Sequence, residues 1–316
     1  MYHTFIGIDI SKAEVVVARQ GHAAVAVFSN DDKGYEAFYQ QYGEVPEKTL
    51  VVLETTGGYE MDLVEFLMEK KVAVHRADTR KVKHFIRSHG TKAKSDAVDA
   101  KSLALYGSER YEILALFKGK SAQAKELAQL TRRRMDIKQM LVQEKNRAQT
   151  PQQQWIAKSC EAVIEVLEAQ IVEMDRKINQ LIEADNEWKS KQKTLQSIAG
   201  IGPIVSNYLI ALLPELGHLD RRRIASLVGL APYPCESGQR KGYRKTYGGR
   251  QEVRGILFMA AMTASRSRSA LGDFYRHLLA KGKPKMVAMT ALMRKIIVIA
   301  NARVAELFKT LAQATT

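Results

Sequence analysis

The sequence predicts an α/β N-terminal domain with a mixed sheet, a helical coiled-coil hairpin and a mostly α-helical C-terminal domain. Residues 1–118 alternate short apolar runs with amphipathic segments, and residues 119–190 are almost free of strand-like segments. Residues 191–316 combine apolar helices with a basic, loop-rich stretch. A chain of 316 residues usually forms two or three domains, so we expect boundaries near residues 118 and 190.

The first domain begins with three apolar strands and a helix. Residues 4–11 form a short apolar run, and the runs at 13–21 and 23–29 are joined by a Gly-containing turn. The segment DDKGYEAFYQQYG, residues 31–43, fits a helix. The short turn between two apolar runs predicts a hairpin.

The rest of this domain alternates strands with helices. Residues 49–58 and 72–78 are strand-like, and apolar spacings of three to four predict an amphipathic helix at 59–71 between them. A further helix is expected at 95–107 with Ser95 as its N-cap. A hairpin followed by this alternation predicts a mixed sheet flanked by helices.

The second part predicts a long helical hairpin. Pro151 breaks the helical pattern, and helices this polar need a partner to bury their apolar stripes. The first stripe comprises Leu127, Leu130, Ile137 and Leu141. The second, close to a heptad seam, comprises Val163, Leu167, Gln170, Met174, Ile178 and Leu181. Spacing or oligomerisation is the expected role of this hairpin.

The third part begins with a Gly-Ile-Gly-Pro turn at 200–203 between two expected helices. This turn resembles a helix-hairpin-helix element, whose backbone N–H groups can face a phosphate. A tight helix–helix turn that needs glycine is an equally good interpretation. A basic stretch at 220–250 follows, and then apolar helices continue to the end.

Composition excludes several protein classes. With 46% hydrophobic and 26% charged residues the chain is not disordered, and no apolar run reaches the roughly 18–20 residues of a membrane span. The N-terminus lacks the pattern of a signal peptide. Cys160 and Cys235 are too few for a disulfide scaffold or a zinc site. We therefore expect a cytoplasmic protein; that it is bacterial, with nucleoid-associated activity, is implied only by the family resemblance given below.

The positive charge is confined to the third part. Lys and Arg number 16 against 17 Asp and Glu in residues 1–118, 12 against 11 in 119–190, and 21 against 6 in 191–316. The whole net charge of +15 therefore belongs to the last part. A uniformly solubilising surface would not leave 190 residues neutral, so the pattern favours a nucleic-acid partner.

Four acids form a candidate metal site. Asp9 lies in an apolar strand and Glu54 ends another, where a charge is costly unless it is paired or binds a metal. Asp96 and Asp99 are three residues apart on an expected helix, so both project from one face. Carboxylate oxygens suit Mg²⁺ or Mn²⁺, and two such ions can clamp a phosphodiester.

Each acid also has a purely structural interpretation. Asp9 can cap a turn, Glu54 can be a surface residue, and Asp96 can be a first-turn acid favoured by the helix dipole. Glu60 and Glu14 compete for the second position. Glu60 falls in the following helix and Glu14 lies past the first strand, so we prefer Glu54.

The motifs GIDISK, LETTGGY and KSDAVDA resemble the DEDD signature of insertion-sequence transposases with a RuvC-like (RNase H-like) domain. This is the IS-one-ten group, which includes the Piv-type DNA invertases, and the resemblance covers nearly the whole chain. It implies double-stranded donor and target DNA as substrates and two divalent ions held by Asp9, Glu54, Asp96 and Asp99. It also implies a structured noncoding guide (bridge) RNA and a dimer or tetramer joined through the coiled coil.

The resemblance also assigns a nucleophile. In the family, the serine of the matching Ser-Gly block joins DNA through a phosphoserine, and here that residue is Ser237. By itself a Ser-Gly pair is usually a turn, and the hydroxyl needs activation. His218 is the one histidine in the neighbourhood, so activation is expected from the metal site. Cys235 is the alternative nucleophile, although nothing local marks it as a thiolate.

Basic and aromatic residues around the serine are the expected nucleic-acid contacts. Tyr233 lies between two prolines and is expected to pack, whereas Tyr243 is expected to stack on a base. The predicted contacts are Lys92, Lys94, Arg221, Arg222, Arg223, Arg240, Lys241, Tyr243, Arg244, Lys245 and Arg250.

Three functions follow from these features. The first is a DNA transposase or serine recombinase whose metal site and serine, from two different domains, close on the same phosphate. The second is a metal-dependent, junction-resolving nuclease with water as nucleophile and a structural Ser237. The third is a basic architectural protein with structural acids, which leaves two strand-end carboxylates without a purpose.

Overall fold

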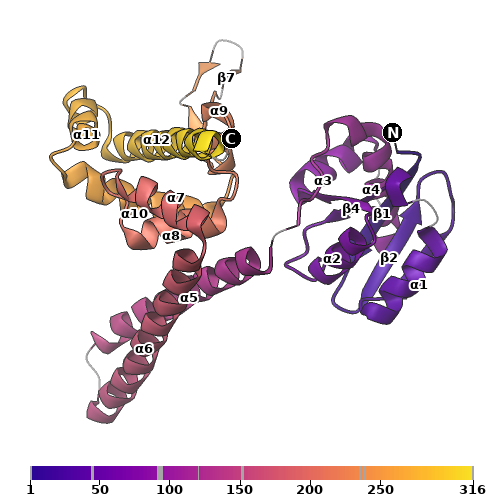
Figure 1. Ribbon diagram of the computed structural model, residues 1–316, viewed down its shortest axis with the longest axis horizontal. Coiled ribbons are helices and arrows are strands. Elements are labelled where there is room, and N and C mark those ends of the chain that lie inside the picture. Colours follow the sequence, from indigo (N-terminus) through magenta and orange to yellow (C-terminus); the bar gives the residue numbers. More distant parts are fainter. Residues whose placement is uncertain are drawn as a thin grey trace. The chain divides into compact units, whose positions relative to one another are not determined.

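A computed structural model describes residues 2–43, 46–90, 95–119, 121–150, 153–234, 236–237, 240–242 and 244–314. The contacts between residues divide the chain into two compact units, Met1–Gly119 and Lys120–Thr316 (Figure 1). The expected boundary near residue 118 thus coincides with the end of the first unit. By the same contacts, the helical hairpin belongs with the C-terminal helices, and its separation as a third domain stays a prediction.

The first unit is built on a five-stranded mixed sheet. Its strands are β1 (Thr4–Ile10), β2 (Glu14–Arg19), β3 (Val25–Ser29), β4 (Thr49–Glu54) and β5 (Ala73–Ala77), in the order β3-β2-β1-β4-β5. β1, β2 and β3 pair antiparallel, whereas β1, β4 and β5 pair parallel. Each strand lies within its predicted segment, so the mixed sheet is confirmed.

Helices cover both faces of this sheet. On one face, α1 (Asp32–Tyr42) and α2 (Met61–Glu69) bury aromatic and aliphatic residues against Ile6, Ile8 and Leu53. On the other face lies α4 (Asp96–Arg110), whose Leu103 packs with Leu50 and whose Ala100 packs against β2. Two short 3₁₀ turns, Pro46–Lys48 and Tyr111–Ile113, complete the connections. This arrangement fits a RuvC-like domain.

Helix α3 (Thr79–Ser88) is an element for which the sequence analysis made no prediction. Asp78 caps its first turn, because the carboxylate accepts hydrogen bonds from the backbone N–H groups of Arg80 (2.8 Å) and Lys81 (3.3 Å). Its buried face consists of Val82 and Phe85, too few apolar residues to be conspicuous in a segment rich in cations.

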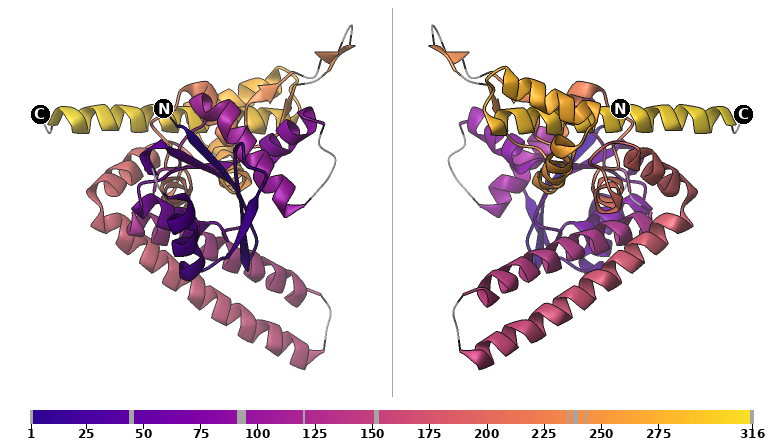
Figure 2. Two further views of the ribbon diagram at one scale, coloured as in Figure 1. Left: turned by 90° about the vertical axis from the view of Figure 1, so that its right-hand side faces the viewer. Right: turned by 90° about the vertical axis from the view of Figure 1, so that its left-hand side faces the viewer.

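The second unit begins with two long antiparallel helices, α5 (Ala122–Ala148) and α6 (Gln154–Ala184) (Figures 1 and 2). Leu127, Ile137 and Leu141 of the predicted α5 stripe are buried. The observed α6 stripe begins at Cys160, which is buried, and is shifted by one residue from the predicted stripe along the first half of the helix. Val163 (43% exposed) and Gln170 face solvent, whereas their neighbours Ile164 and Ile171 are half-buried.

A buried ion pair fastens the hairpin to the helices that follow. Arg134 of α5 donates two hydrogen bonds to Asp175 of α6, at 2.5 and 2.8 Å, and one to the hydroxyl of Tyr208 at 2.9 Å. Ile178 and Ile182 join the hydrophobic core of the C-terminal helices. The hairpin therefore shares its core with the rest of the unit.

The remaining helices are α7 (Asn186–Gln196), α8 (Pro203–Leu212), α9 (Arg221–Leu227), α10 (Gln251–Arg266), α11 (Ala270–Ala280) and α12 (Lys285–Ala314). The Gly-Ile-Gly-Pro turn joins α7 to α8, as predicted. At Gly200, φ is +92° and an added Cβ would lie 2.3 Å from the carbonyl oxygen of Ala260. This close approach to α10 explains the glycine as a packing requirement, which favours the structural interpretation of the turn.

Between α9 and α10 the chain forms a narrow ribbon of four two-residue strands. β6 (Pro232–Tyr233) pairs with β9 (Lys245–Thr246), and β7 (Glu236–Ser237) pairs with β8 (Arg240–Lys241). In the part of the chain that the structure describes, no helix is long and apolar enough to cross a membrane.

Candidate active site

Asp9 and Glu54 are brought together by the parallel pairing of β1 and β4. The register places Ile8 opposite Leu53, so the next residues on the two strands, Asp9 and Glu54, are at the same level. Successive strand residues face opposite sides of the sheet. Ile8 and Leu53 are buried on the α1–α2 face, and the two acids therefore lie on the face that α4 covers.

Helix α4 carries the other two acids to the same end of the sheet. Gly7 is the closest approach of β1 to α4, because a Cβ there would lie 2.0 Å from the carbonyl oxygen of Ala100 and 2.2 Å from the backbone nitrogen of Ala104. The first turn of α4 consequently lies beyond Gly7, toward Asp9. Asp99 is half-buried and Asp96 is exposed.

The beginning of α4 is fixed by its predicted cap. The hydroxyl of Ser95 accepts a hydrogen bond from the backbone N–H of Val98 at 3.3 Å. Negative charge in a first turn is favoured by the helix dipole. Asp96 and Asp99 are therefore compatible with a stable helix start, and of the two it is Asp99 whose charge acts on Glu54 at the strand end.

The carboxyl group of Glu54 has the electrostatics of a shared acidic site. Burial raises its pKa above the ordinary value, and the negative charges of Asp9 and Asp99 add to this rise. A hydrogen bond from Thr79 and the charge of Lys83 oppose the rise. Three of the four predicted acids are thus electrostatically coupled, and a cation among them would relieve their repulsion.

The donor set fits a hard divalent cation, because all four side chains offer carboxylate oxygens. Among the described residues, no three His, Cys, Asp or Glu side chains are yet grouped closely enough to hold an ion. Asp9, Glu54 and Asp99 are the residues that would hold it, with Asp96 at the exposed edge.

Glu60, the competing acid, has a different role. Its side chain is fully buried and pairs with Arg76. It also accepts hydrogen bonds from the backbone N–H of Gly58 (3.0 Å) and from the backbone N–H and hydroxyl of Thr56 (both 3.2 Å). Glu60 thus fixes the loop that follows Glu54, and its oxygens are occupied.

A row of cations on α3 lies beside the acids. Arg80, Lys83 and Arg87 recur at helical spacing on one exposed face, and Lys83 is close enough to influence Glu54. The sequence signal that reveals α3 is Asp78 as N-cap, followed by buried positions at 82 and 85. This local excess of positive charge was not predicted, because the domain as a whole is nearly neutral.

The serine lies in the ribbon of the second unit. Ser237 is in β7 and pairs with Arg240 of β8. The side chains of Ser237, Arg240 and Lys241 lie outside the described part. So do the whole residues Cys235, Tyr243, Lys92 and Lys94.

The other predicted contacts fall into two groups. Arg221, Arg222 and Arg244 line one cavity, and Lys245 is exposed on β9. Arg223 instead forms an exposed ion pair with Asp220 at 3.4 Å.

Arg250 differs from these cations. Its guanidinium binds the carboxylate of Glu215 with two hydrogen bonds, at 2.7 and 2.5 Å, and the carbonyl oxygen of Leu212 at 2.9 Å. Because these bonds occupy the guanidinium, the geometry favours a structural anchor over the predicted nucleic-acid contact. Tyr233 packs against Tyr247, with ring centroids 4.7 Å apart, and its hydroxyl lies 2.7 Å from that of Ser226. This contact agrees with the packing role predicted for Tyr233.

Comparisons with known proteins agree with this architecture. Residues 6–151 match a family described as Transposase, and residues 192–276 match one described as Transposase IS116/IS110/IS902 family. The chain is 28% identical over 311 residues to the pilin gene-inverting proteins of Moraxella bovis and of Moraxella lacunata, covering 96% of each chain. It is also 29% identical over 131 residues, 41% of this chain and 32% of the other, to the insertion element IS116 uncharacterized 44.8 kDa protein of Streptomyces clavuligerus.

Proposed function

Because this chain belongs to the IS110-type transposases and invertases, a family of enzymes that act on DNA, we propose that it cleaves and rejoins DNA strands through Ser237. The carboxylates of Asp9, Glu54, Asp96 and Asp99 hold the divalent metal on which the DEDD family depends. The observation that carries this proposal is the level register of Asp9 and Glu54 beneath the first turn of α4.

The metal is Mg²⁺, or Mn²⁺ in its place, and two ions are bound. Both ions prefer carboxylate oxygens, and four acids with a substrate phosphate provide enough ligands for a pair. When bound, such ions neutralise the charge that develops on the phosphate oxygens. The chain itself contributes the fixed strand ends, the capped helix start and the loop that Glu60 holds.

The serine performs a transesterification. Its Oγ forms a bond to phosphorus while the bond from phosphorus to one sugar oxygen breaks, and the serine proton passes to solvent as the sugar hydroxyl gains one. A hydroxyl of the new strand then attacks the phosphoserine and releases Ser237 by the reverse exchange. The number of phosphoester bonds is conserved, so rejoining needs no external energy source.

The mechanism uses the metal site of the first unit and Ser237 of the second, from the same chain or from neighbouring protomers. A dimer or tetramer formed through α5 and α6 is consistent with this arrangement. The exposed Val163, Val166 and Val172 on α6 support such an assembly, with the hairpin acting as a coiled coil.

The specificity is delegated to a structured noncoding guide RNA. The basic cations of the second unit suit the phosphates of RNA as well as those of DNA, because phosphate contacts carry no sequence information. RNA sequenced after a pull-down of the protein in high salt tests this part of the proposal. One defined noncoding RNA is expected, whereas random fragments contradict RNA guidance.

The serine mechanism is tested with Ser237→Ala. The unmodified protein, incubated with substrate DNA and Mg²⁺, is expected to form a covalent protein–DNA adduct that survives denaturation, and Ser237→Ala is expected to form none. Cys235→Ala is the matched control and should keep the adduct. Continued cleavage by Ser237→Ala, with no adduct from either protein, would instead identify a junction-resolving nuclease that uses water.

A further inference from the structure

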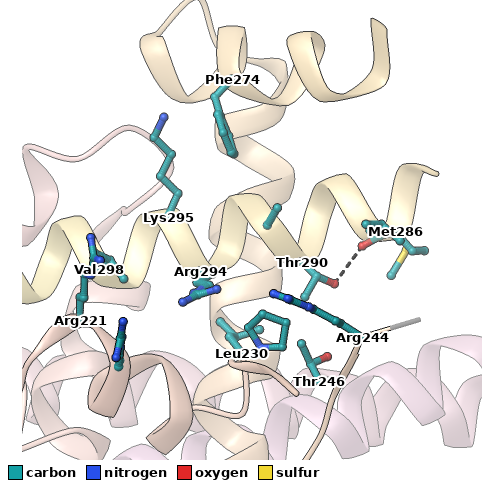
Figure 3. A pocket seen from close by; sticks show the side chains of 14 residues that line it. Arg221, Leu230, Arg244, Thr246, Phe274, Met286, Thr290, Arg294, Lys295 and Val298 are labelled. Carbon is teal, nitrogen blue, oxygen red and sulfur yellow. Dashed lines mark hydrogen bonds between the residues drawn. The ribbon is translucent and has the colours of Figure 1, made fainter. Parts of the chain in front are cut away.

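A cavity of about 900 Å³ lies in the second unit, at the base of the ribbon that carries Ser237. Pro232 and Thr246, which pair across the bottom of the ribbon, both line it, and α9, α11 and α12 supply the other walls (Figure 3). Its size is within the range of cavities that bind a small organic ligand.

The wall of this cavity, which we call the basic cavity, combines cations with an apolar floor. The cations are Arg221, Arg222, Arg244, Arg294 and Lys295. Leu230, Ala291 and Val298 contribute apolar surface, and none of the described residues that line the wall is acidic. A ligand that fits such a wall presents a flat apolar face together with negative charge.

These cations differ from most other arginines of the second unit. Arg134, Arg250 and Arg276 are each paired with a carboxylate. Within the described part of the chain, by contrast, none of the five cations of the basic cavity forms an ion pair.

Two of these cations are partly withdrawn from solvent. Arg294 and Lys295 are half-buried neighbours on α12, and Lys295 is placed 3.9 Å above the ring of Phe274. In Figure 3, Arg244 extends from the ribbon toward Arg294, so two guanidinium groups approach the same space. Like charges at a partly desolvated position repel, and an anion bound between them reverses that cost.

We propose that the basic cavity holds one unstacked nucleotide of a nucleic-acid strand, its base on the apolar floor and its phosphates on Arg244 and Arg294. An unpaired base offers a flat apolar face, and guanidinium groups bind phosphate oxygens in a bidentate manner. A fully paired duplex keeps its bases stacked and cannot fill the cavity in this way.

The position of the cavity links it to the serine. The five residue-to-residue steps from Pro232 to Ser237 span at most about 17 Å of extended chain. A strand with one nucleotide in the basic cavity therefore has its next phosphates within reach of Ser237. The proposal rests on the proposed function for the class of partner, and it adds that the strand near the serine is locally unpaired.

The test measures binding by the full-length protein in EDTA, so that cleavage and metal binding play no part. Fluorescence anisotropy compares a labelled single-stranded DNA, the RNA of the same sequence, and the fully paired DNA duplex. The tighter of the two single strands identifies DNA or RNA as the occupant. Failure of the serine mechanism leaves these affinities unchanged, so the two proposals fail separately.

Two variants separate the floor from the cations. Ala291→Trp fills the floor without changing charge, and it should weaken single-strand binding about tenfold while leaving duplex binding and the salt dependence unchanged. Arg294→Gln should weaken binding and lower the slope of log affinity against log salt by about 0.7, as expected for one lost phosphate contact on a single strand. The matched control is Lys309→Gln, an exposed cation farther along α12.

The proposal is overturned if Ala291→Trp binds the single strands like the unmodified protein, or if it weakens single strands and duplex equally. Arg294→Gln provides the decision if Ala291→Trp does not fold. If Arg294→Gln weakens binding no more than Lys309→Gln does, the basic cavity contributes only general surface charge and the proposal is overturned.

Discussion

Arg76 of β5 is hydrogen-bonded to the fully buried carboxylate of Glu60, and the second oxygen of that carboxylate holds the backbone of the loop that follows Glu54. One structural acid thus positions the loop next to a candidate metal ligand. The consequence is that stability and activity of the first unit are coupled at this loop.

We expect Glu60→Ala to destabilise the first unit by about 3 kcal/mol, because removing one partner of a buried pair leaves the other charge uncompensated. Urea unfolding, followed by the fluorescence of residues in this unit, measures the loss. Glu69→Ala, at an exposed position at the end of α2, is the control and should cost much less.

The same carboxylate predicts a sensitivity to acid. Burial alone raises the pKa of Glu60, but backbone hydrogen bonds and Arg76 outweigh burial and hold the pKa below its ordinary value of 4.5. A lowered pKa contributes stability that is fully present above 4.5 and is lost as pH falls through the folded value. Unfolding midpoints measured downward from pH 6 should fall less steeply in Glu60→Gln than in the unmodified protein.

For Glu54 we expect the opposite dependence of stability on pH. Because its pKa is raised in the folded state, the ionised carboxylate opposes folding. The stability that the protonated carboxyl group contributes is therefore lost as pH rises through the folded pKa. Without metal, Glu54→Gln should therefore be more stable than the unmodified protein at neutral pH. With Mg²⁺ at about ten times its Kd, the unmodified protein should gain roughly 1.4 kcal/mol, and Glu54→Gln little or nothing. Thermal unfolding in EDTA and in Mg²⁺ checks both statements, and an equal gain in the two proteins would remove Glu54 from the metal site.

The cations of α3 predict a salt-dependent contribution to duplex binding. Each neutralised phosphate changes the slope of log affinity against log salt by about 0.9, so Arg80→Gln, Lys83→Gln and Arg87→Gln together should reduce it by roughly 2 to 3. Lys33→Gln, on α1 at the opposite face of the sheet, should leave the slope nearly unchanged. The slope is obtained from duplex binding measured at several salt concentrations. An unaltered slope in the triple variant contradicts a role for α3 in DNA binding.

Gly7 predicts the cost of separating β1 from α4. A Cβ at this position would overlap backbone atoms of Ala100 and Ala104, which cannot move as a side chain can. Gly7→Ala should therefore destabilise the first unit by about 3 kcal/mol and displace Asp96 and Asp99, with loss of DNA cleavage. Gly255→Ala, in α10 with open space around it, is the control and should be neutral or slightly stabilising.

Local sequence patterns were sufficient for most of the first unit. Apolar runs bounded by turns predicted all five strands, and the capping residue predicted the start of α4, because these features depend on neighbours along the chain. Helix α3 was missed because its apolar face has few residues. Val163 was predicted to lie in the buried stripe of α6, but it is exposed, and the observed stripe begins at Cys160. A one-residue shift of a stripe depends on how the partner helix is placed, which the sequence does not show.

The sequence alone selected Asp9, Glu54, Asp96 and Asp99 as candidate metal ligands, because strand ends, spacing and the resemblance all pointed to them. Only the tertiary structure showed that Asp9, Glu54 and Asp99 influence one another, since the register of β1 and β4 and the contact at Gly7 join residues far apart in the chain. Arg250 is a second example. Its place among basic residues predicted a nucleic-acid contact, whereas the structure pairs its guanidinium with Glu215. Charge and periodicity are properties of the chain, whereas the partner of a charge is set by packing.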